Sequence, residues 1–406
     1  MFYIFKDNVF LIDGHVKSCI YDLNQSKLYH INNTLAEKLK QAINGLITTN
    51  STDDELKKAF NYLLNKDILL LSDKPETNNF QDIYYTRNNC HFAWIEITEK
   101  CNLKCRHCYN ESDEQKKISL TISDFKFVID NLLKLGIKKI QIIGGEPFII
   151  GQKLKEMIDY TTGKFEVVEI FTNGTLITKE WLNYLKQSGL KIALSVYSYD
   201  CIIHDKVTNC KGSWEKTNQT IEMLNEYNIP YRVCNVLMRD IELGKPTTKL
   251  YTLSEKKDIV RMSGRADFSL LSDELIKKKL ITKRTFSHPL NKNFVCMSAC
   301  EHNCFSSKIY ISARLDVYPC VMERRIKHCK INKTDGITLK DSIRKMNKDY
   351  IKECCLCEYR YTCFDCRPNS LSSDLYEKPW YCTYKPLLGT WENEDEFIRK
   401  LKDKWS

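Results

Sequence analysis

Cysteine is the residue that most constrains this chain, because nineteen of its 406 residues are cysteines and they are unevenly placed. Residues 1–89 contain only Cys19, whereas residues 296–382 contain eleven. A disulfide framework would spread its bridges through the fold, and the first residues do not form a secretory signal. Clustered cysteines in a large chain without a signal favour metal binding over disulfides.

The overall composition sets further limits. A hydrophobic content of 43% is enough for well-packed cores, and no apolar run of about 18 residues could cross a membrane. The net charge of +10 is spread along the chain, and its densest run, residues 277–279, lies in an ordinary amphipathic segment. This pattern favours a solvated surface over a nucleic-acid site, and leaves room for a mild attraction to an acidic peptide. We expect a cytoplasmic protein that binds neither nucleic acid nor membrane.

Strand-like and helix-like patterns alternate from Phe92 to about Met262. Between two predicted strands, for example, Phe125, Val128 and Leu132 recur at helical spacing. Such alternation is typical of a parallel sheet with crossover helices, so we predict an α/β fold with a partial (β/α)6 barrel over residues 90–284. The helix expected over residues 239–256 is weak, because Gly244 and Pro246 interrupt it. The predicted strands are 93–98, 139–143, 167–172, 192–197, 232–237 and 259–262.

Three other segments flank the predicted barrel. Residues 1–85 show short strands and then two helices, the second opening with a capping box at Thr52 and Glu55, which together resemble a winged-helix module. Residues 76–90 are polar and indicate a linker. Residues 285–390 are rich in cysteine and poor in periodicity, as expected where metal centres replace a core. Residues 391–406 form a last amphipathic helix.

A loop with three cysteines, Cys101, Cys105 and Cys108, directly follows the first predicted barrel strand. A structural zinc site needs four ligands, and only His107, placed between two of the cysteines, could complete this set. A four-iron cubane held by three thiolates instead leaves one iron open to an outside ligand. The missing fourth ligand suggests an iron–sulfur cluster as a hypothesis for this loop, and the spacing alone does not decide between iron and zinc.

Polar residues also follow the next three strands. Gly144, Gly145, Glu146 and Pro147 end the second strand, where two glycines would let a ligand approach the backbone and a carboxylate could accept a hydrogen bond from an ammonium group. Thr172–Asn173 ends the third strand and Ser195 lies near the end of the fourth. Because function in such barrels collects at the carboxyl ends of strands, we predict one site at this rim.

These motifs resemble the radical S-adenosylmethionine (SAM) superfamily. The resemblance implies that SAM chelates the open iron of a [4Fe-4S] cluster and is cleaved to a 5′-deoxyadenosyl radical that abstracts a substrate hydrogen. It also implies roles for individual residues. Glu146 would bind the SAM amino group, Tyr109 would lie by the adenine, and Ser195 would lie near the ribose or carboxylate.

The second cysteine cluster has the spacing C-x2-C-x5-C-x2-C over residues 354–366, which taken alone fits a zinc knuckle equally well. After a radical SAM barrel it resembles a SPASM domain, which holds two auxiliary [4Fe-4S] clusters. Cys296 competes with Cys300 for one ligand position, and Leu315 stands where that family often has glycine. The resemblance implies one cluster on Cys300, Cys304, Cys320 and Cys366 and another on Cys354, Cys357, Cys363 and Cys382.

SPASM enzymes mostly modify peptides and proteins, and residues 1–85 resemble a leader-recognition domain that binds a peptide as an added edge strand. A packing cap without a ligand is the alternative for this module. The nearest resemblance is to the SPASM peptide maturases of grasp-with-spasm systems, carried by residues 5–7, 20–23, 357–361 and 365–367. It implies a carbon–carbon or thioether cross-link in a ribosomal precursor peptide, with an external electron donor and an ATP-grasp ligase as partners.

Two other functions remain open. An anaerobic sulfatase-maturase-like enzyme would carry aspartate directly after the cysteine equivalent to Cys320, but Val321 occupies that position. A non-enzymatic zinc adaptor would not need the Gly144–Pro147 motif, and the first cysteine loop lacks a fourth ligand.

Overall fold

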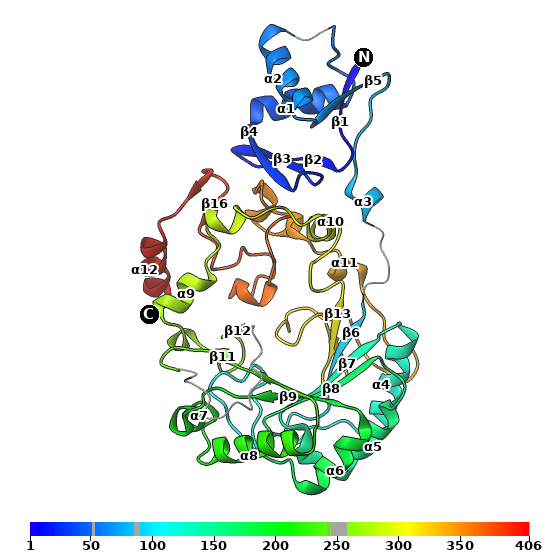
Figure 1. Cartoon of the computed structure of the whole chain (residues 1–406), viewed down its shortest axis with the longest axis vertical. Coiled ribbons are helices and arrows are strands. Elements are labelled where there is room, and N and C mark those ends of the chain that lie inside the picture. The colour runs from blue at the N-terminus through cyan, green and yellow to red at the C-terminus, as the bar shows by residue number, and fades with distance from the viewer. Residues whose placement is uncertain (51–52, 85–89, 242–243, 245–257, 406) are drawn as a thin grey trace. The chain divides into compact units, whose positions relative to one another are not determined.

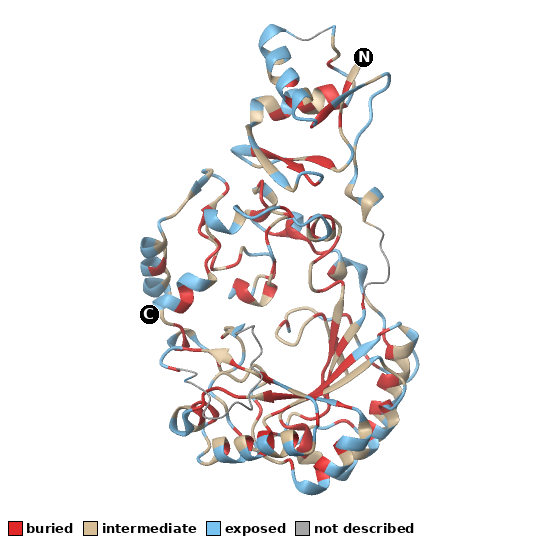
Figure 2. Ribbon diagram, viewed as in Figure 1, coloured by how far each residue is buried: buried red, intermediate tan, exposed pale blue. Residues whose placement is uncertain are grey.

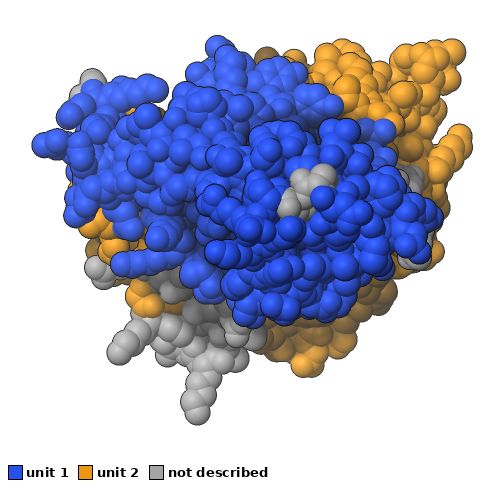
Figure 3. Space-filling view, turned by 90° about the horizontal axis from the view of Figure 1, so that it is seen from above, with its two compact units in different colours: residues 1–87, 280–303, 345–404 blue, residues 88–279, 304–344, 405–406 orange. Residues whose placement is uncertain are grey.

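The computed structural model describes residues 1–50, 53–84, 90–241, 244 and 258–405. The chain divides into two compact units, each discontinuous in sequence (Figure 3). Unit 1 comprises residues 1–87, 280–303 and 345–404, and unit 2 comprises residues 88–279, 304–344 and 405–406. The predicted domains 1–85, 90–284, 285–390 and 391–406 stay a prediction.

Unit 1 begins with strands and two helices in the predicted order (Figure 1). Asn32 caps the first helix by accepting from the Leu35 amide, and Asp53 caps the second by accepting from the Leu56 amide. Thr52, half of the predicted capping box, lies outside the described residues. The strands are β1 (Phe2–Phe5), paired antiparallel with β5 (Leu69–Ser72), and an antiparallel sheet of β2 (Val9–Ile12), β3 (Lys17–Asp22) and β4 (Lys27–Asn32); the helices are α1 (Asn33–Ile43) and α2 (Asp54–Asn65).

Alternate side chains of β2 and β3 point to opposite sides of this small sheet. Each side packs into its own hydrophobic core. Val9 and Ile20 join a core with the helical residues Leu39 and Phe60. The opposite face supplies Phe10, Ile12, Cys19 and Tyr21 to a second core with Leu290, Val295, Cys296 and Tyr361.

The rest of unit 1 has little regular structure, as the cysteine-rich composition predicts. The segment predicted as a linker contains a short helix whose Phe80 ring stacks on Phe10, with 3.8 Å between ring centroids. The elements are α3 (Phe80–Ile83), α10 (Lys292–Cys300), β16 (Tyr384–Lys385), β17 (Thr390–Trp391), α12 (Glu394–Trp405) and the 3-10 helices η3 (Lys283–Phe286), η4 (Lys348–Tyr350), η5 (Cys354–Leu356) and η6 (Arg367–Ser370).

Unit 2 is built on one sheet whose strands β6 to β10 are all parallel and consecutive in sequence. The helices lie along the outer side of this sheet, with their sheet-facing residues buried (Figures 1 and 2). The α/β partial barrel is therefore confirmed. The strands are β6 (Phe92–Glu96), β7 (Lys139–Ile143), β8 (Val167–Thr172), β9 (Lys191–Ser195) and β10 (Tyr231–Cys234); the helices are α4 (Ile122–Lys134), α5 (Gln152–Thr161), α6 (Lys179–Ser188), α7 (Cys201–Thr208) and α8 (Ser213–Glu226).

The far end of the predicted barrel differs from the expected pattern. The strand expected over residues 232–237 breaks at Asn235, and β11 (Val236–Leu237) pairs in parallel with β12 (Asp258–Ile259) outside the main sheet. The helix expected over residues 239–256 falls mostly outside the described residues. Shorter elements of unit 2 are η1 (Pro147–Ile150), η2 (Phe268–Leu270), α9 (Asp273–Lys279) and α11 (Asp341–Arg344).

The other edge of the sheet is extended by residues that follow the barrel. Strand β13 (Lys308–Ile311) pairs in parallel with β6, and β14 (Asp316–Tyr318) and β15 (Cys329–Lys330) follow antiparallel. The full sheet therefore has the order β10-β9-β8-β7-β6-β13-β14-β15. Residues 304–344, predicted as part of a separate cysteine-rich domain, belong to the same compact unit as the barrel.

Candidate active site

A cavity of ≈ 230 Å³ opens at the carboxyl ends of the parallel strands in unit 2. Most of the predicted rim residues line it, whereas Glu146 and Pro147 are buried behind it. The predicted residues in its wall are Cys101, Cys105, Cys108, Tyr109, Gly144, Gly145, Thr172, Asn173 and Ser195. The topology thus brings together side chains from the ends of four successive strands.

The three-cysteine loop is held mainly through its backbone. The amides of Lys104 and Arg106 donate to the carbonyl oxygens of Thr208 and Val207, at the end of α7, at 3.2 and 2.9 Å. The amide of Cys101 donates to the carbonyl of Asp113 at 3.0 Å. The Asn102 side chain, between two of the cysteines, also donates to the Thr175 hydroxyl at 2.7 Å and accepts from Asn173 at 3.0 Å, so backbone and side chain together fix the loop.

Gly264 and Arg265 also contact the cysteine loop, and the sequence analysis missed them. The Arg265 amide donates to the Cys108 carbonyl at 3.1 Å, and its guanidinium donates to the carbonyls of Cys105 and Ser112, each at 2.9 Å. Gly264 has φ +59°, and a Cβ there would lie 2.3 Å from the Cys108 carbonyl oxygen. A Gly-Arg pair carries no motif of its own, so only the fold reveals this contact.

Positions 144 and 145 require glycine because another part of the backbone passes close to both. A Cβ on Gly144 would lie 2.4 Å from the Thr98 carbonyl oxygen, and one on Gly145 would lie 2.2 Å from that of Lys100. In addition, the Gly145 amide donates to the Thr98 carbonyl at 2.8 Å. Besides lining the cavity, the two glycines therefore pack the end of β7 against the start of the cysteine loop.

Glu146 is fully buried, and its carboxylate organises the end of β8. One oxygen accepts from the Phe148 amide at 3.0 Å and the Thr172 hydroxyl at 2.7 Å, and the other accepts from the Asn173 amide at 2.8 Å. Burial raises the pKa of Glu146 to about 7 even though these hydrogen bonds favour the charged form. Its predicted role as partner of an ammonium group stays a prediction.

Aromatic and imidazole rings form the wall nearest Cys105. Tyr197 lines the cavity and stands edge-on to His107 with ring centroids 4.7 Å apart. Burial, and then the charge of Arg265, lower the pKa of His107 to about 4. The imidazole of His107 is therefore neutral at physiological pH and can contact a ligand without adding charge.

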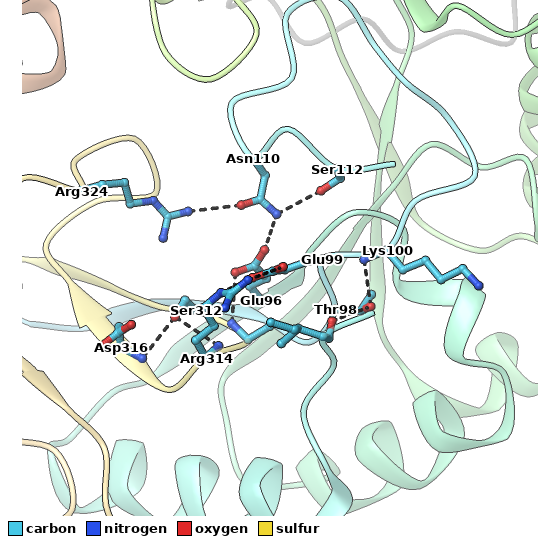
Figure 4. A network of polar contacts seen from close by, with 12 residues as sticks. Glu96, Thr98, Glu99, Lys100, Asn110, Ser112, Ser312, Arg314, Asp316 and Arg324 are labelled. Atoms are coloured by element: carbon cyan, nitrogen blue, oxygen red, sulfur yellow. Dashed lines mark hydrogen bonds and ion pairs between the residues drawn. The ribbon is translucent and has the colours of Figure 1, made fainter. Parts of the chain in front are cut away.

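A buried polar network lies behind the cysteine loop and connects β6 to β13 (Figure 4). The Glu96 carboxylate, 2% exposed, accepts from the Asn110 amide group, the Tyr310 hydroxyl and the Ala313 amide. Arg324 donates to the Tyr310 hydroxyl at 2.8 Å. Asn110 lies two residues beyond Cys108, so the network links the added strands to the loop that carries the cysteines.

The three cysteines fit an iron–sulfur cluster better than isolated thiols. All three line one cavity, and each of Cys105 and Cys108 raises the pKa of Cys101 by its charge, after burial as the main cause. Burial also raises the pKa of Cys105 to about 12. Thiols this buried ionise when a metal centre binds them. Cys101, Cys105 and Cys108 would be its ligands.

Four of the predicted auxiliary ligands converge in unit 1. Cys354, Cys357, Cys363 and Cys382 line one cavity, and Cys363 adds, after burial, to the raised pKa of each of the other three. Among the described residues, no three metal-ligating side chains are placed to hold a single metal ion. A cubane distributes its thiolates over separate irons and so needs them further apart.

The other predicted set is divided between the units. Cys300 and Cys366 belong to unit 1, and Cys304 and Cys320 belong to unit 2. This set stays a prediction, as does the choice between Cys296 and Cys300. All nineteen cysteines are described, and none of them forms a disulfide bond.

Comparison with known proteins identifies the barrel. Residues 95–239 match the model of the Radical SAM superfamily. This segment is a radical SAM domain. The match counts against the non-enzymatic zinc adaptor. No helix among the described residues has the length and apolarity to cross a bilayer.

The chain also resembles two proteins of Bacillus subtilis over about a third of its length. The antilisterial bacteriocin subtilosin biosynthesis protein AlbA is 39% identical over 143 residues, or 35% of this chain and 32% of AlbA. The sporulation killing factor maturation protein SkfB is 29% identical over 137 residues, or 34% of this chain and 33% of SkfB. The matched region thus spans about a third of the length of each relative.

Among solved structures, Streptococcus suis SuiB bound to its precursor peptide SuiA superposes with a TM-score of 0.57 over 93% of this chain and 98% of SuiB, at 12% identity. The SAM-bound enzyme anSMEcpe superposes with a TM-score of 0.51 over 78% of this chain and 94% of that protein, at 14% identity. At these identities the likeness concerns the fold alone.

Proposed function

We propose that this radical SAM enzyme matures a ribosomally made precursor peptide by installing a carbon–carbon or thioether cross-link. The observation that carries the proposal is the radical SAM domain joined to a cysteine-rich segment whose four thiols converge in unit 1. AlbA is named for biosynthesis of the bacteriocin subtilosin, SkfB for maturation of the sporulation killing factor, and SuiB is bound to a precursor peptide; these relatives support a peptide substrate.

In this proposal Cys101, Cys105 and Cys108 hold the cluster that binds SAM. When bound, the cluster and SAM supply a 5′-deoxyadenosyl radical able to remove a hydrogen atom from the substrate. Glu146 fixes Thr172 and Asn173 and offers its buried carboxylate to the SAM ammonium. The remaining wall positions the reacting side chain and excludes water.

Cross-link formation needs an electron acceptor as well as a radical. One substrate hydrogen leaves with the 5′-deoxyadenosyl group, and formation of the new bond then releases one further electron and one proton. We assign the acceptor to an auxiliary [4Fe-4S] cluster on Cys354, Cys357, Cys363 and Cys382, with a second one on Cys300, Cys304, Cys320 and Cys366. An external one-electron donor and an ATP-grasp ligase complete the proposed system.

The leader of the precursor would bind along β4. This strand is an edge of its three-stranded sheet, and its residues Lys27, His30 and Asn32 are exposed. The opposite edge, β2, is already engaged, because Asn78 donates to the Val9 carbonyl at 2.9 Å. Adding the leader to β4 would raise the effective concentration of the core peptide at the active site.

Coexpression with a candidate precursor tests the proposal. We expect the peptide to lose the mass of two hydrogen atoms, and the purified anaerobic enzyme to form 5′-deoxyadenosine. Cys105→Ala should abolish both, whereas Cys210→Ala, outside the cavity, should abolish neither. An unchanged peptide mass while SAM is cleaved would reject the cross-link, and conversion of a cysteine or serine to formylglycine would favour the sulfatase-maturase alternative.

Leader binding needs a separate test. Deleting residues 1–85 is unsuitable, because it would expose the core that Tyr21 forms with Leu290 and Tyr361. Hydrogen–deuterium exchange avoids this problem. A full precursor should protect the amides of residues 27–32, whereas a precursor without its leader should not, and equal protection by both would return this module to the packing-cap interpretation.

A further inference from the structure

Lys348 is a buried cation in the wall of the cavity that the four cysteines of unit 1 share. Its side chain belongs to the 3-10 helix η4, and the residue is 5% exposed. A lysine ammonium is seldom buried without a compensating anion, because it loses its hydration. The anion that balances Lys348 therefore needs to be identified.

Asp365 is a buried carboxylate that acts on Lys348, but it also pairs with another cation. Arg367, 0% exposed, donates to Asp365 Oδ1 through Nε at 2.9 Å and also through Nη2. His302 Nε2 lies 3.5 Å from the other oxygen. Asp365 carries a single negative charge and faces two buried cations, Arg367 and Lys348, so one positive charge is left over.

The other anions around Lys348 can come from the cysteines. Cys354, Cys357, Cys363 and Cys382 line the same cavity as Lys348. A thiol carries no charge, so cysteines without a metal would leave the charge of Lys348 unbalanced. A metal centre that converts four thiols to thiolates would supply the missing negative charge.

We infer that Lys348 is a positioning residue for this centre, acting as the internal counter-cation of the anionic cluster on Cys354, Cys357, Cys363 and Cys382. This inference rests on the auxiliary cluster proposed above. A fixed positive charge in a low-dielectric site favours the more negative, reduced form of the cluster. Lys348 therefore promotes cluster loading and raises the reduction potential, which suits a group that accepts an electron from the substrate.

Charge-changing substitutions test this role with readouts independent of peptide modification. The background is a full-length chain with Cys101, Cys105 and Cys108 each changed to alanine, so that remaining iron reports auxiliary centres only. The signal of interest is the one that Cys363→Ala removes. In this background, iron, sulfide and the midpoint potential from redox titration followed by electron paramagnetic resonance are compared among Lys348→Met, Lys348→Arg and Asp365→Asn.

We expect Lys348→Met to lower the midpoint potential or the iron content of that centre, and Lys348→Arg to preserve both. Asp365→Asn removes a negative charge and should shift the potential upward, opposite to Lys348→Met. Unchanged potential and loading in Lys348→Met would overturn the inference, as would equal losses in the Met and Arg variants. If the parent background holds no iron, the auxiliary cluster itself is absent, and that result is distinct from a failure of Lys348.

Discussion

Arg265 supports the predicted cluster ligand Cys105 from outside the cysteine loop, because its Nε–H donates to the carbonyl oxygen of Cys105 at 2.9 Å. The same side chain reaches Ser112, so a single planar group joins two turns of the loop. The contact is made to backbone oxygens and does not involve the sulfur of Cys105, which is the predicted cluster ligand. The loop that would hold the cluster is therefore shaped by β12 and the residues after it as well as by β6.

Replacing Arg265 should impair the active site without unfolding the protein. In Arg265→Lys one ammonium cannot reach both carbonyl oxygens, so we expect the rate of 5′-deoxyadenosine formation to fall about 10- to 100-fold, as for other residues that orient metal ligands. Arg399→Lys, at an exposed position of α12, is the matched control. Equal rates for the two variants, measured on protein with full iron content, would show that Arg265 does not position the loop.

Gly145→Ala should displace the start of the cysteine loop. The new Cβ would lie 2.2 Å from the Lys100 carbonyl oxygen and 2.9 Å from the Cys101 amide nitrogen, and neither backbone atom can move freely. We expect a lower Tm and reduced iron binding. Gly136→Ala serves as control: its φ of +76° costs about 1 kcal/mol for a side chain, but nothing lies within 4 Å. If Gly145→Ala lowered the Tm and the iron content less than Gly136→Ala does, the predicted steric clash would be contradicted.

SAM binding should release protons if Glu146 meets the ammonium group. The free carboxyl has a pKa of about 7 because of burial, so it is partly protonated at neutral pH. A nearby cation favours the ionised form and lowers that pKa, which expels the proton. Calorimetric titrations in buffers of different ionisation enthalpy measure this release. The proton release should vanish in Glu146→Gln. If the unsubstituted protein releases no proton, the ammonium group does not bind next to Glu146.

Much of the barrel could be predicted because its local patterns are unambiguous. The strands at 139–143 and 167–172 were predicted with the bounds that the structure gives, since each is a short apolar run between turn signals. The three cysteines and the residues at the next strand ends were placed at one rim by the topology of parallel sheets alone. For these features, the apolar pattern of each strand and the rule that parallel strands end at one rim were sufficient to predict the structure.

Other features depend on contacts that no local pattern encodes. Strand β13 joins the barrel through pairing with β6, whose residues lie more than two hundred positions earlier, as in Tyr310 and Trp94. Asn235 interrupts a continuous apolar run without any glycine or proline to signal it. Arg265 and Lys348 are ordinary basic residues in sequence, and their importance arises only from burial and from the groups they meet.

The hydrogen bonds around Glu96 predict how a single hydroxyl on the added strand β13 affects the stability of the protein. Tyr310 is 0% exposed, and its hydroxyl donates to Glu96 while accepting from Arg324. Tyr310→Phe keeps the ring but leaves a buried carboxylate with one donor fewer, which should lower the free energy of unfolding by about 1–3 kcal/mol. Tyr318→Phe on the adjoining strand is the control and should change it by about 0.5 kcal/mol or less. Asn110 also donates to Glu96 and lies close to Cys108 in the chain, so the Tyr310 variant should lose iron faster than the Tyr318 variant during denaturant titration. Equal free energies of unfolding for the two variants would show that the Tyr310 hydroxyl does not support the cysteine loop.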